Sequence, residues 1–260
     1  MIRPPSLFVS HGAPTILIEE SPVRSFLSGL GEELGRPEAI LAVSAHWETQ
    51  LPTLQWCENP ETIHDFRGFP DELYRFQYGA KGSPTLAARV TELLGAHFEC
   101  VERDETRGYD HGAWVPLALM YPDAGIPVVQ LSLQPQQSPA YQYLVGKALR
   151  PLRDEGVLVI GSGNLTHNIQ HFRDHGWDDP PEAWVLEFSD WMNGAIAEDR
   201  REDLLDYRRR APHAERNHPE EEHLLPLFVA LGAGEAGGAG RRLHTSTTHG
   251  TLMMDVFAFG

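Results

Sequence analysis

Three histidines in this sequence each follow a short apolar stretch of the kind that forms a buried strand. They are, with the stretch before each, His11 (6–10), His46 (39–45) and His167 (156–160). Such stretches are too short for a stable helix and long enough for a strand that is buried on both faces. In open α/β sheets, ligands bind in the crevice outside the carboxyl ends of the strands. The pattern therefore predicts a crevice in which imidazoles meet and can hold a metal ion.

Histidine is also unusually frequent, at 13 of 260 residues, and several histidines lie in contexts rich in Gly, Asn, Trp and Pro. His111 is one of them, and the segment 217–223 contains others. Any one of these histidines alone can be a structural residue, but together they favour a shared site. His111 can cap the apolar segment 114–120, with Asp110 as its orienting partner, or it can contact a substrate. The remaining histidines are expected to be surface or structural residues: His64, His97, His171, His175, His213, His244 and His249.

The choice of metal depends on the ligand types. Neutral imidazole is a ligand for Fe, Zn, Cu and Ni, and a carboxylate among the ligands moves the choice toward Fe(II) or Zn. Glu220, Glu221 and Glu222 stand directly before His223. They are typical of the acidic first turn of a helix, where the helix dipole stabilises negative charge, and one of them is equally a candidate ligand. Spacing alone does not choose between these interpretations.

Composition narrows the classes of function. The formal net charge of −16 argues against binding to nucleic acid or to an anionic membrane surface, because both depend on basic side chains. Cys57 and Cys100 have no metal-ligand spacing, and two cysteines fit a reducing cytoplasm better than a disulfide scaffold. No apolar run approaches 18 residues, and the N-terminal residues lack the apolar core of a signal peptide. We expect a soluble, cytoplasmic protein whose oligomeric state the sequence leaves open.

The elements that must position the histidines follow from local signals. Ser-Pro pairs, in which serine caps a helix and proline takes its first position, predict helices that begin at Pro22, Pro84 and Pro139. A longer helix is predicted from Pro181 to about Asp199. Strands are predicted at 6–10, 39–45, 53–56, 98–102, 127–133, 156–160 and 252–259. Strands that alternate with helices predict a single α/β domain with a central mixed β-sheet flanked by helices.

Two strands and one loop carry further expectations. The stretches 39–45 and 53–56 are too close for a helical crossover, which favours some antiparallel pairing. The Gly-rich segment 232–240 follows a helix-like apolar run at 224–231 and is interpreted as a mobile loop. Gly161-Ser-Gly suggests a phosphate loop only weakly, because neither the full GxGxxG pattern nor a GK[ST] motif follows.

Five motifs are distributed along nearly the whole chain: 10–14 (SHGAP), 44–47 (SAHW), 110–114 (DHGAW), 161–168 (GSGNLTHN) and 222–227 (EHLLPL). In content and order they resemble one enzyme family, the class III extradiol ring-cleavage dioxygenases. The similarity is greatest to the DOPA-dioxygenase-type branch, which is related to the catalytic subunit of protocatechuate 4,5-dioxygenase. The resemblance therefore implies that residues 1–260 form one catalytic domain.

The resemblance implies a mononuclear non-haem metal site that uses Fe(II) in the working enzyme. It assigns His11 and His46 as ligands and takes the third ligand from the 218–223 segment. The DOPA-type branch suggests His223 as this ligand, whereas the protocatechuate branch uses a glutamate, which makes Glu222 the alternative. Zn(II) can be the occupant in purified protein.

The resemblance also implies a reaction and roles for two more histidines. A catechol reacts poorly with triplet O₂ unless a metal with open positions binds both. His167 would take a proton from the catechol and later return it, a role suited to a pKa near neutrality. His111 would donate a hydrogen bond over the substrate or O₂ pocket. Cleavage beside the two hydroxyls would give a muconic semialdehyde-type product.

Two interpretations from other classes stay open on the sequence alone. A zinc hydrolase can use the same ligand set with a bound water. A non-catalytic binding protein can be built on the same fold. Metal content separates the binding protein from both enzymes, and O₂ consumption separates the dioxygenase from the hydrolase.

Overall fold

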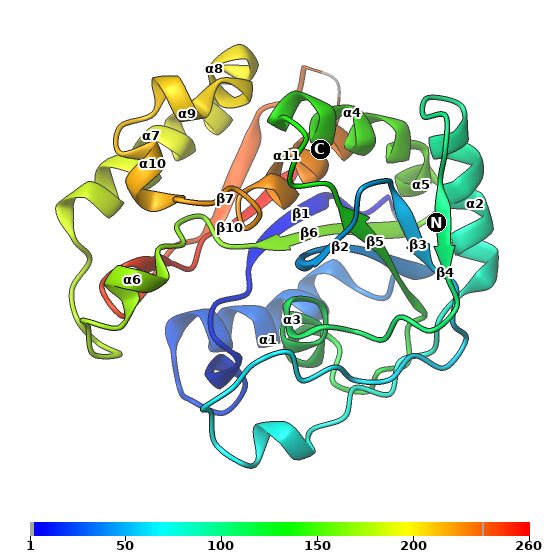
Figure 1. Ribbon diagram of the computed structural model, residues 1–260, viewed down its shortest axis with the longest axis horizontal. Coiled ribbons are helices and arrows are strands. Elements are labelled where there is room, and N and C mark those ends of the chain that lie inside the picture. The colour runs from blue at the N-terminus through cyan, green and yellow to red at the C-terminus, as the bar shows by residue number, and fades with distance from the viewer. Residues whose placement is uncertain (1–2, 236) are drawn as a thin grey trace.

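An eight-stranded β-sheet forms the centre of the molecule (Figure 1). The computed structural model describes residues 3–235 and 237–260. The order of strands in the sheet is β4-β3-β5-β2-β6-β1-β10-β7, and β8 and β9 form a separate two-stranded sheet. The strands are β1 (Ser6–Ser10), β2 (Ala39–Glu48), β3 (Thr53–Gln55), β4 (Glu102–Asp104), β5 (Val128–Leu133), β6 (Val157–Gly163), β7 (Gly240–His244), β8 (Thr247–Thr248), β9 (Leu252–Met253) and β10 (Val256–Phe259).

The sheet is parallel at its centre, has antiparallel pairs on both sides of it, and ends at one edge in β4, which is parallel to β3. Strands β5, β2, β6 and β1 are parallel neighbours, whereas β3 is antiparallel to β5 and β10 is antiparallel to β1 and β7. This arrangement confirms the predicted single α/β domain with a central mixed sheet. Because β1, β2 and β6 run in the same direction, their carboxyl ends meet at one edge of the sheet.

The helices begin where the serine caps predict them. The side chains of Ser21, Ser83 and Ser138 each accept a hydrogen bond from a backbone N–H in the first turn of α1, α2 and α4, respectively. The helices are α1 (Pro22–Leu34), α2 (Pro84–Gly95), α3 (His111–Met120), α4 (Pro139–Leu149), α5 (Pro151–Asp154), α6 (Ile169–Phe172), α7 (Ala183–Ala197), α8 (Arg201–Leu205), α9 (Tyr207–Arg210), α10 (Ala214–Asn217) and α11 (Leu225–Ala233), with short 3-10 helices η1 (Pro14–Leu17) and η2 (Leu73–Arg75).

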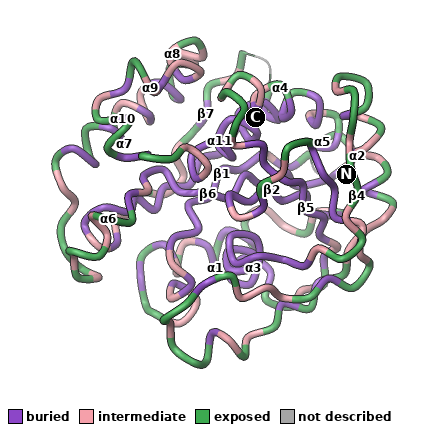
Figure 2. Tube along the Cα trace, in the orientation of Figure 1, coloured by how far each residue is buried: buried purple, intermediate pink, exposed green. Residues whose placement is uncertain are grey.

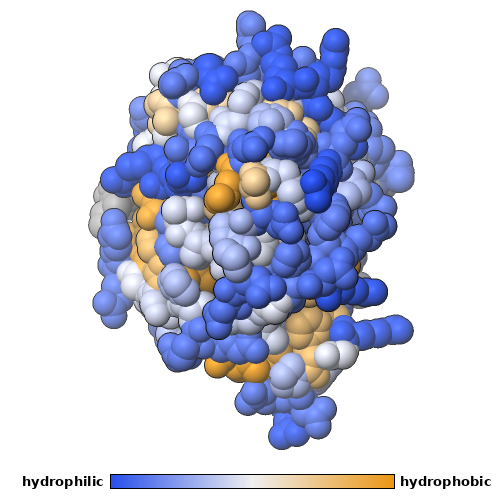
Figure 3. All heavy atoms as spheres, turned by 90° about the vertical axis from the view of Figure 1, so that its left-hand side faces the viewer, coloured by the Kyte–Doolittle hydropathy of each residue, from blue (hydrophilic) through white to orange (hydrophobic). Residues whose placement is uncertain are grey.

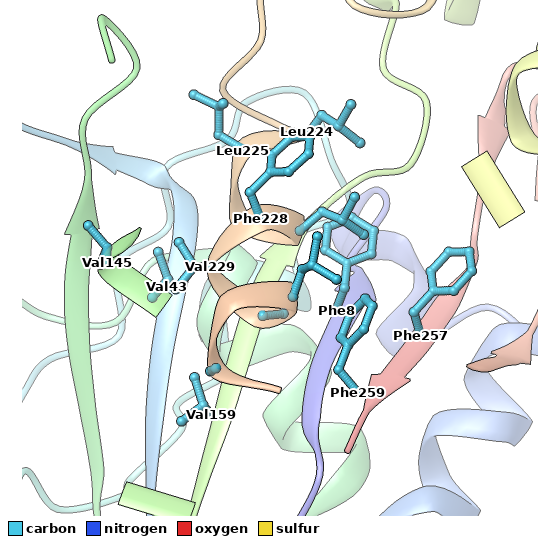
Figure 4. Packing of buried hydrophobic residues seen from close by; sticks show 14 of the residues in the cluster. Phe8, Val43, Val145, Val159, Leu224, Leu225, Phe228, Val229, Phe257 and Phe259 are labelled. Carbon is cyan, nitrogen blue, oxygen red and sulfur yellow. The ribbon is translucent and has the colours of Figure 1, made fainter. Parts of the chain in front are cut away.

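Alternate residues of the central strands pack into two hydrophobic layers. In β2, Leu41 and Val43 face the layer that contains α2, α4, α7 and α11, whereas Ile40 and Ala42 face the layer that contains α1 and α3. Figure 4 shows Phe228 and Val229 of α11 among the strand residues of the first layer. The buried trace in Figure 2 is continuous through the central strands, α3 and α11, so both faces of the sheet are covered.

Three predictions of strands and loops are wrong in part. The strand predicted at 98–102 begins only at Glu102, where pairing with β3 starts, because a partner strand and not local composition sets its position. The strand predicted at 252–259 is divided into β9 and β10, which belong to different sheets. The segment 232–240 contributes its ends to α11 and β7, a strand that was not predicted, and its residue 236 lies outside the described residues.

The pairing of β2 and β3, which are close in the sequence, also differs from the expectation. β2 and β3 are not neighbours, because β5 lies between them and pairs with both. β3 is antiparallel as expected, but its partner is a strand more than 70 residues away in the sequence. Among the described residues, no helix combines the length and the apolar character that a membrane crossing requires.

The glycines of the Gly161-Ser-Gly motif serve packing. A Cβ at Gly161 would lie 2.1 Å from the carbonyl oxygen of Pro226, and one at Gly163 would lie 2.0 Å from the carbonyl oxygen of His223. The backbone of β6 therefore contacts both the first turn of α11 and the residues just before it more closely than any side chain allows. This contact places His223 beside the carboxyl end of β6.

We expect Gly163→Ala to lower the free energy of unfolding by about 1–3 kcal/mol, because a backbone carbonyl must move to make room for the methyl group. The matched control is Gly29→Ala in α1, where no atom lies within 4 Å of the added Cβ. That substitution should stabilise the protein by roughly 0.5–1 kcal/mol, as is typical for glycine in a helix interior. Urea unfolding of both variants measures the difference, and equal stabilities would contradict the packing argument.

Candidate metal centre

Imidazoles from three distant segments meet at the carboxyl edge of the sheet. His11 follows β1, His46 lies near the end of β2, and His223 precedes α11. One ring nitrogen from each lies within 4.8 Å of the others, and the Nε2 atoms of His11 and His46 are 3.0 Å apart. Nitrogen donors at this separation can share one cation.

The hydrogen bonds of Ser162 fix the tautomer of His11. The Ser162 hydroxyl donates to the carbonyl oxygen of Gly112, so its oxygen is left to accept the Nδ1–H of His11 at 3.1 Å. With its proton on Nδ1, His11 presents a lone pair on Nε2 to the cluster. Metal-binding histidines are commonly oriented by such an acceptor behind the ring.

Carboxylates lie behind the other two rings. Nδ1 of His223 donates to Oε1 of Glu222 at 2.8 Å, which leaves Nε2 of His223 free. Nδ1 of His46 faces Oδ2 of Asp65 at 3.6 Å. Each ring of the cluster therefore has an oxygen acceptor on its far side.

Burial keeps these imidazoles neutral. It lowers the pKa of His11 and of His223 well below the usual range, and neighbouring histidines lower both further. Burial, followed by the charge of His111, lowers the pKa of His46 to about 4. Neutral imidazole is the form that binds a metal, so at neutral pH no proton competes for these nitrogens.

His111 begins α3 and joins the cluster from the opposite layer. Its ring centroid is 4.0 Å from that of His46. Asp65 accepts hydrogen bonds from both Nδ1 and the backbone N–H of His111, at 2.9 and 3.0 Å. The expected orienting partner, Asp110, does not fill this role. It is the N-cap of α3, and its carboxylate accepts hydrogen bonds from Ser44, Gln130 and Arg107.

Asp65 carries its negative charge at neutral pH. Burial alone would raise the pKa of its carboxyl group, but the hydrogen bond and charge of His111, together with His46, lower it to about 2. The carboxylate of Asp65 thus orients both His46, which belongs to the cluster, and His111, which lies next to it.

The glycine after His111 permits the approach of α3. A Cβ at Gly112 would lie 2.4 Å from Oγ of Ser44 and 2.9 Å from Cδ2 of His46. The sequence Asp110-His111-Gly112 therefore combines a helix cap, a ring that faces the cluster and a position without a side chain.

His167 lies on the other side of the cluster. Its ring stacks on that of His223, with centroids 3.5 Å apart and an angle of 16° between the planes. Burial, with the charges of His218 and other histidines, lowers its pKa to about 3. This value differs from the near-neutral pKa expected for it, because the ring is buried among other imidazoles and not partly solvated.

Of the other residues in the 218–223 segment, Glu222 lies beside the cluster, whereas His218 takes no part in it. The ring of His218 points away from the cluster and bonds through Nε2 to the carbonyl oxygen of Leu165. The glutamates at 220–222 were expected in the first turn of a helix. They lie instead before α11, because that helix begins only at Leu225. Burial raises the pKa of Glu222, whose Oε1 is also 3.9 Å from Nδ1 of His167.

A cavity of about 550 Å³ opens beside the imidazoles. His11, His46, His111, His167 and His223 all line it, together with Asn164. His249 lines it as well, although it was expected to be only a surface or structural residue. The volume lies within the range of small-molecule sites.

The sequence interpretation missed Asp65, Ser162 and Asn164. Asn164 accepts a hydrogen bond from the backbone N–H of Gly12 and lies 3.5 Å from Nε2 of His11. Asp65 directly follows His64 in a loop with no strand-end signal, so only the folded chain identifies it. Ser162 and Asn164 belong to motifs that were noted for their glycines and for His167.

Comparison with known proteins identifies this arrangement. Residues 6–257 match the family described as the catalytic LigB subunit of aromatic ring-opening dioxygenase. The chain belongs to this LigB family. Its resemblance to the class III extradiol dioxygenases is thereby confirmed, and the enzyme is an oxidoreductase that opens a catechol ring with O₂. The hydrolase and binding-protein interpretations are not favoured.

Relatives of this LigB enzyme cover almost its whole length. It is 42% identical to a protein of Beta vulgaris named 4,5-DOPA dioxygenase extradiol, over 98% of this chain and 96% of that protein. A protein of the same name from Escherichia coli K12 is 39% identical over 89% of this chain and 85% of that protein. The crystal structure of an uncharacterized E. coli K12 protein superposes with a TM-score of 0.81 at 33% identity, covering 98% of this chain and 99% of the other.

We expect Asp65→Asn to weaken the binding of a divalent metal by about 10–100-fold, because the amide cannot orient both His46 and His111 as a carboxylate does. Competition with a chromophoric chelator measures the dissociation constant. Asp71→Asn is the matched control, since Asp71 lies in the same loop and its side chain is 91% exposed. Unchanged metal affinity in Asp65→Asn would show that the carboxylate does not orient the cluster.

Proposed function

We propose that this LigB enzyme uses Fe(II) held by His11, His46 and His223 to cleave the ring of a DOPA-like catechol. The observation that supports the proposal most strongly is the arrangement of the three rings. Their nitrogens converge, and behind each ring lies a hydroxyl or carboxylate oxygen. Such a donor set binds Fe(II) or Zn(II) and is held in place before the metal arrives.

The third ligand is His223 and not Glu222. Two other clusters near the cavity contain a carboxylate, one with His46, Asp65 and His111 and one with His167, Glu222 and His223. In each of them the carboxylate already accepts a hydrogen bond from a histidine Nδ1. Glu222 therefore acts as the orienting partner of His223.

Fe(II) supplies, when bound, the redox chemistry that allows a catechol to react with O₂, whereas zinc has no accessible redox step. The side chains of the protein bind and orient the substrate and move its protons. The cavity walls include Phe66, Phe69 and Trp177, which suit an aromatic ring.

His167 and His111 act on opposite sides of the substrate. Neutral His167 has a free lone pair for a proton from a catechol hydroxyl, and Glu222, whose Oε1 lies 3.9 Å from Nδ1, offsets the lowered pKa of the ring by stabilising its charged form. His111 is held by the hydrogen bond of its Nδ1 to Asp65 and lines the cavity, where it is assigned a hydrogen bond to the substrate or O₂. Opening of the ring beside the two hydroxyls then gives a muconic semialdehyde-type product.

The names of the relatives support the choice of a DOPA-like catechol, and a small molecule and O₂ are the only partners that the reaction requires. The acidic net charge disfavours binding to nucleic acid and to anionic membranes. The enzyme is proposed to act in the cytoplasm.

The proposed function is tested by loading the metal-free protein with Fe(II) or with Zn(II) under argon. The Fe(II) form should consume O₂ when DOPA is added and form a yellow product, and the Zn(II) form should consume none. An oxygen electrode and the visible spectrum measure both outcomes. If the Fe(II) form consumes no O₂ with DOPA or any simple catechol, the proposal is wrong.

The ligand assignment predicts an order of metal loss. His223→Ala should lose stoichiometric metal, whereas Glu222→Gln should keep it with an affinity lowered by about tenfold, because only the orientation of a ligand is affected. Metal content after dialysis measures both, with the exposed His213→Ala as the control. The reverse order of loss would move the ligand to Glu222.

The proposed role of His167 predicts that binding and turnover separate. His167→Ala should retain metal and catechol, yet lose at least about a hundredfold in kcat, the usual contribution of a positioned acid or base. Steady-state kinetics and calorimetric binding to the zinc form give the two quantities. Normal turnover would remove His167 from the mechanism.

A further inference from the structure

Two arginines at the cavity stand out in a strongly acidic protein. Arg67 and Arg173 line the same cavity as the histidines and are exposed. The enzyme has 21 lysines and arginines against 37 aspartates and glutamates, so most cationic side chains can find a carboxylate. Over residues 3–235 and 237–260, neither Arg67 nor Arg173 has a carboxylate within 4.0 Å or a hydrogen-bond partner for its guanidinium group.

The two arginines come from segments that the fold brings together. Arg67 lies in the loop between β3 and α2, directly after Phe66, whose ring is 5.7 Å from that of His111. Arg173 directly follows α6, which begins just beyond His167. In Figure 1, α6 lies beyond the end of β6 and the loop runs along the lower side of the molecule below α3, and both segments contribute residues to the one cavity. Each arginine is thus close in sequence to a residue at the reacting end of the cavity.

Charge is therefore distributed unevenly along the cavity. Its inner end carries imidazole rings, and its walls carry aromatic rings, whereas its exposed parts carry the two guanidinium groups and one carboxylate, that of Glu19. The face of the molecule in Figure 3 is mainly hydrophilic with separate apolar patches, so an exposed charged group is not unusual in itself. The unusual feature is that two cations without a partner border a cavity in a protein of net charge −16.

We propose that Arg67 and Arg173 bind a carboxylate on the side chain of the catechol. The inference rests on the proposed function, because it assumes that the catechol ring lies against the imidazoles. The side chain of such a ring would extend toward the exposed part of the cavity. Guanidinium groups recognise carboxylates through paired N–H donors, and two of them would offset the repulsion that the acidic protein exerts on an anion.

The two arginines are assigned to specificity and not to ring cleavage. An exposed ion pair contributes at most about 1 kcal/mol, which corresponds to about a fivefold change in an equilibrium constant. The effect should therefore appear as a modest change in the preference between substrates. It should also weaken with added salt, since the groups are exposed.

The test compares 3,4-dihydroxyphenylpropionate, which carries a carboxylate, with 4-methylcatechol, which carries no charge. In the Fe(II) enzyme, we expect Arg67→Gln and Arg173→Gln each to lower the ratio of kcat/KM for the carboxylate to kcat/KM for 4-methylcatechol by up to about fivefold, through KM of the carboxylate. The double variant should lower the ratio further. Arg209→Gln is the matched control, because Arg209 is exposed and does not line the cavity.

Calorimetric binding of both catechols to the zinc-loaded protein supplies a measurement that does not depend on turnover. Weaker binding of the carboxylate alone in the two variants supports the subsite. An unchanged ratio of the two affinities overturns it, as does an equal loss for both catechols. If the wild-type Fe(II) enzyme turns over neither catechol, the proposed function fails for those substrates, and the binding measurements still decide whether the carboxylate subsite exists.

Discussion

The site depends on keeping buried imidazoles neutral while their lone pairs point at one another. Each such ring would lose this orientation without an acceptor behind it, because a free imidazole can place its proton on either nitrogen. Ser162 provides that acceptor for His11, Glu222 for His223 and Asp65 for the neighbouring His111. Burial then lowers the pKa of the clustered rings, so that a metal ion meets no competing proton.

Close backbone contacts bring these rings together. Gly163 in β6 allows the segment before α11 to place His223 beside the strand, and Gly112 allows the first turn of α3 to approach His46. The two layers of helices on the sheet therefore meet at the same edge, one supplying a ring of the cluster and the other supplying His111. Protein interiors are packed closely enough that such contacts require the absence of a side chain.

The LigB family match identifies the reaction as the opening of an aromatic ring, and the cavity lined by the clustered histidines is where we propose that it occurs. The inner end of the cavity is made of imidazole rings whose nitrogens converge. The exposed end of the cavity carries groups with charged side chains. In this chain those groups include Arg67 and Arg173, so substrate preference and ring cleavage reside in different parts of one cavity.

The sequence by itself determined where most of the secondary-structure elements begin and which histidines belong to the site. Serine caps fixed the starts of three helices, and apolar stretches located β1, β2, β5 and β6, because these signals act over a few residues. The tertiary structure alone decided which side chains accept hydrogen bonds from these histidines. Asp65 is 46 residues from His111, and Ser162 is 151 residues from His11. The insertion of β5 between β2 and β3 is likewise a long-range contact. Such contacts depend on how the layers pack around the sheet, which no local pattern encodes.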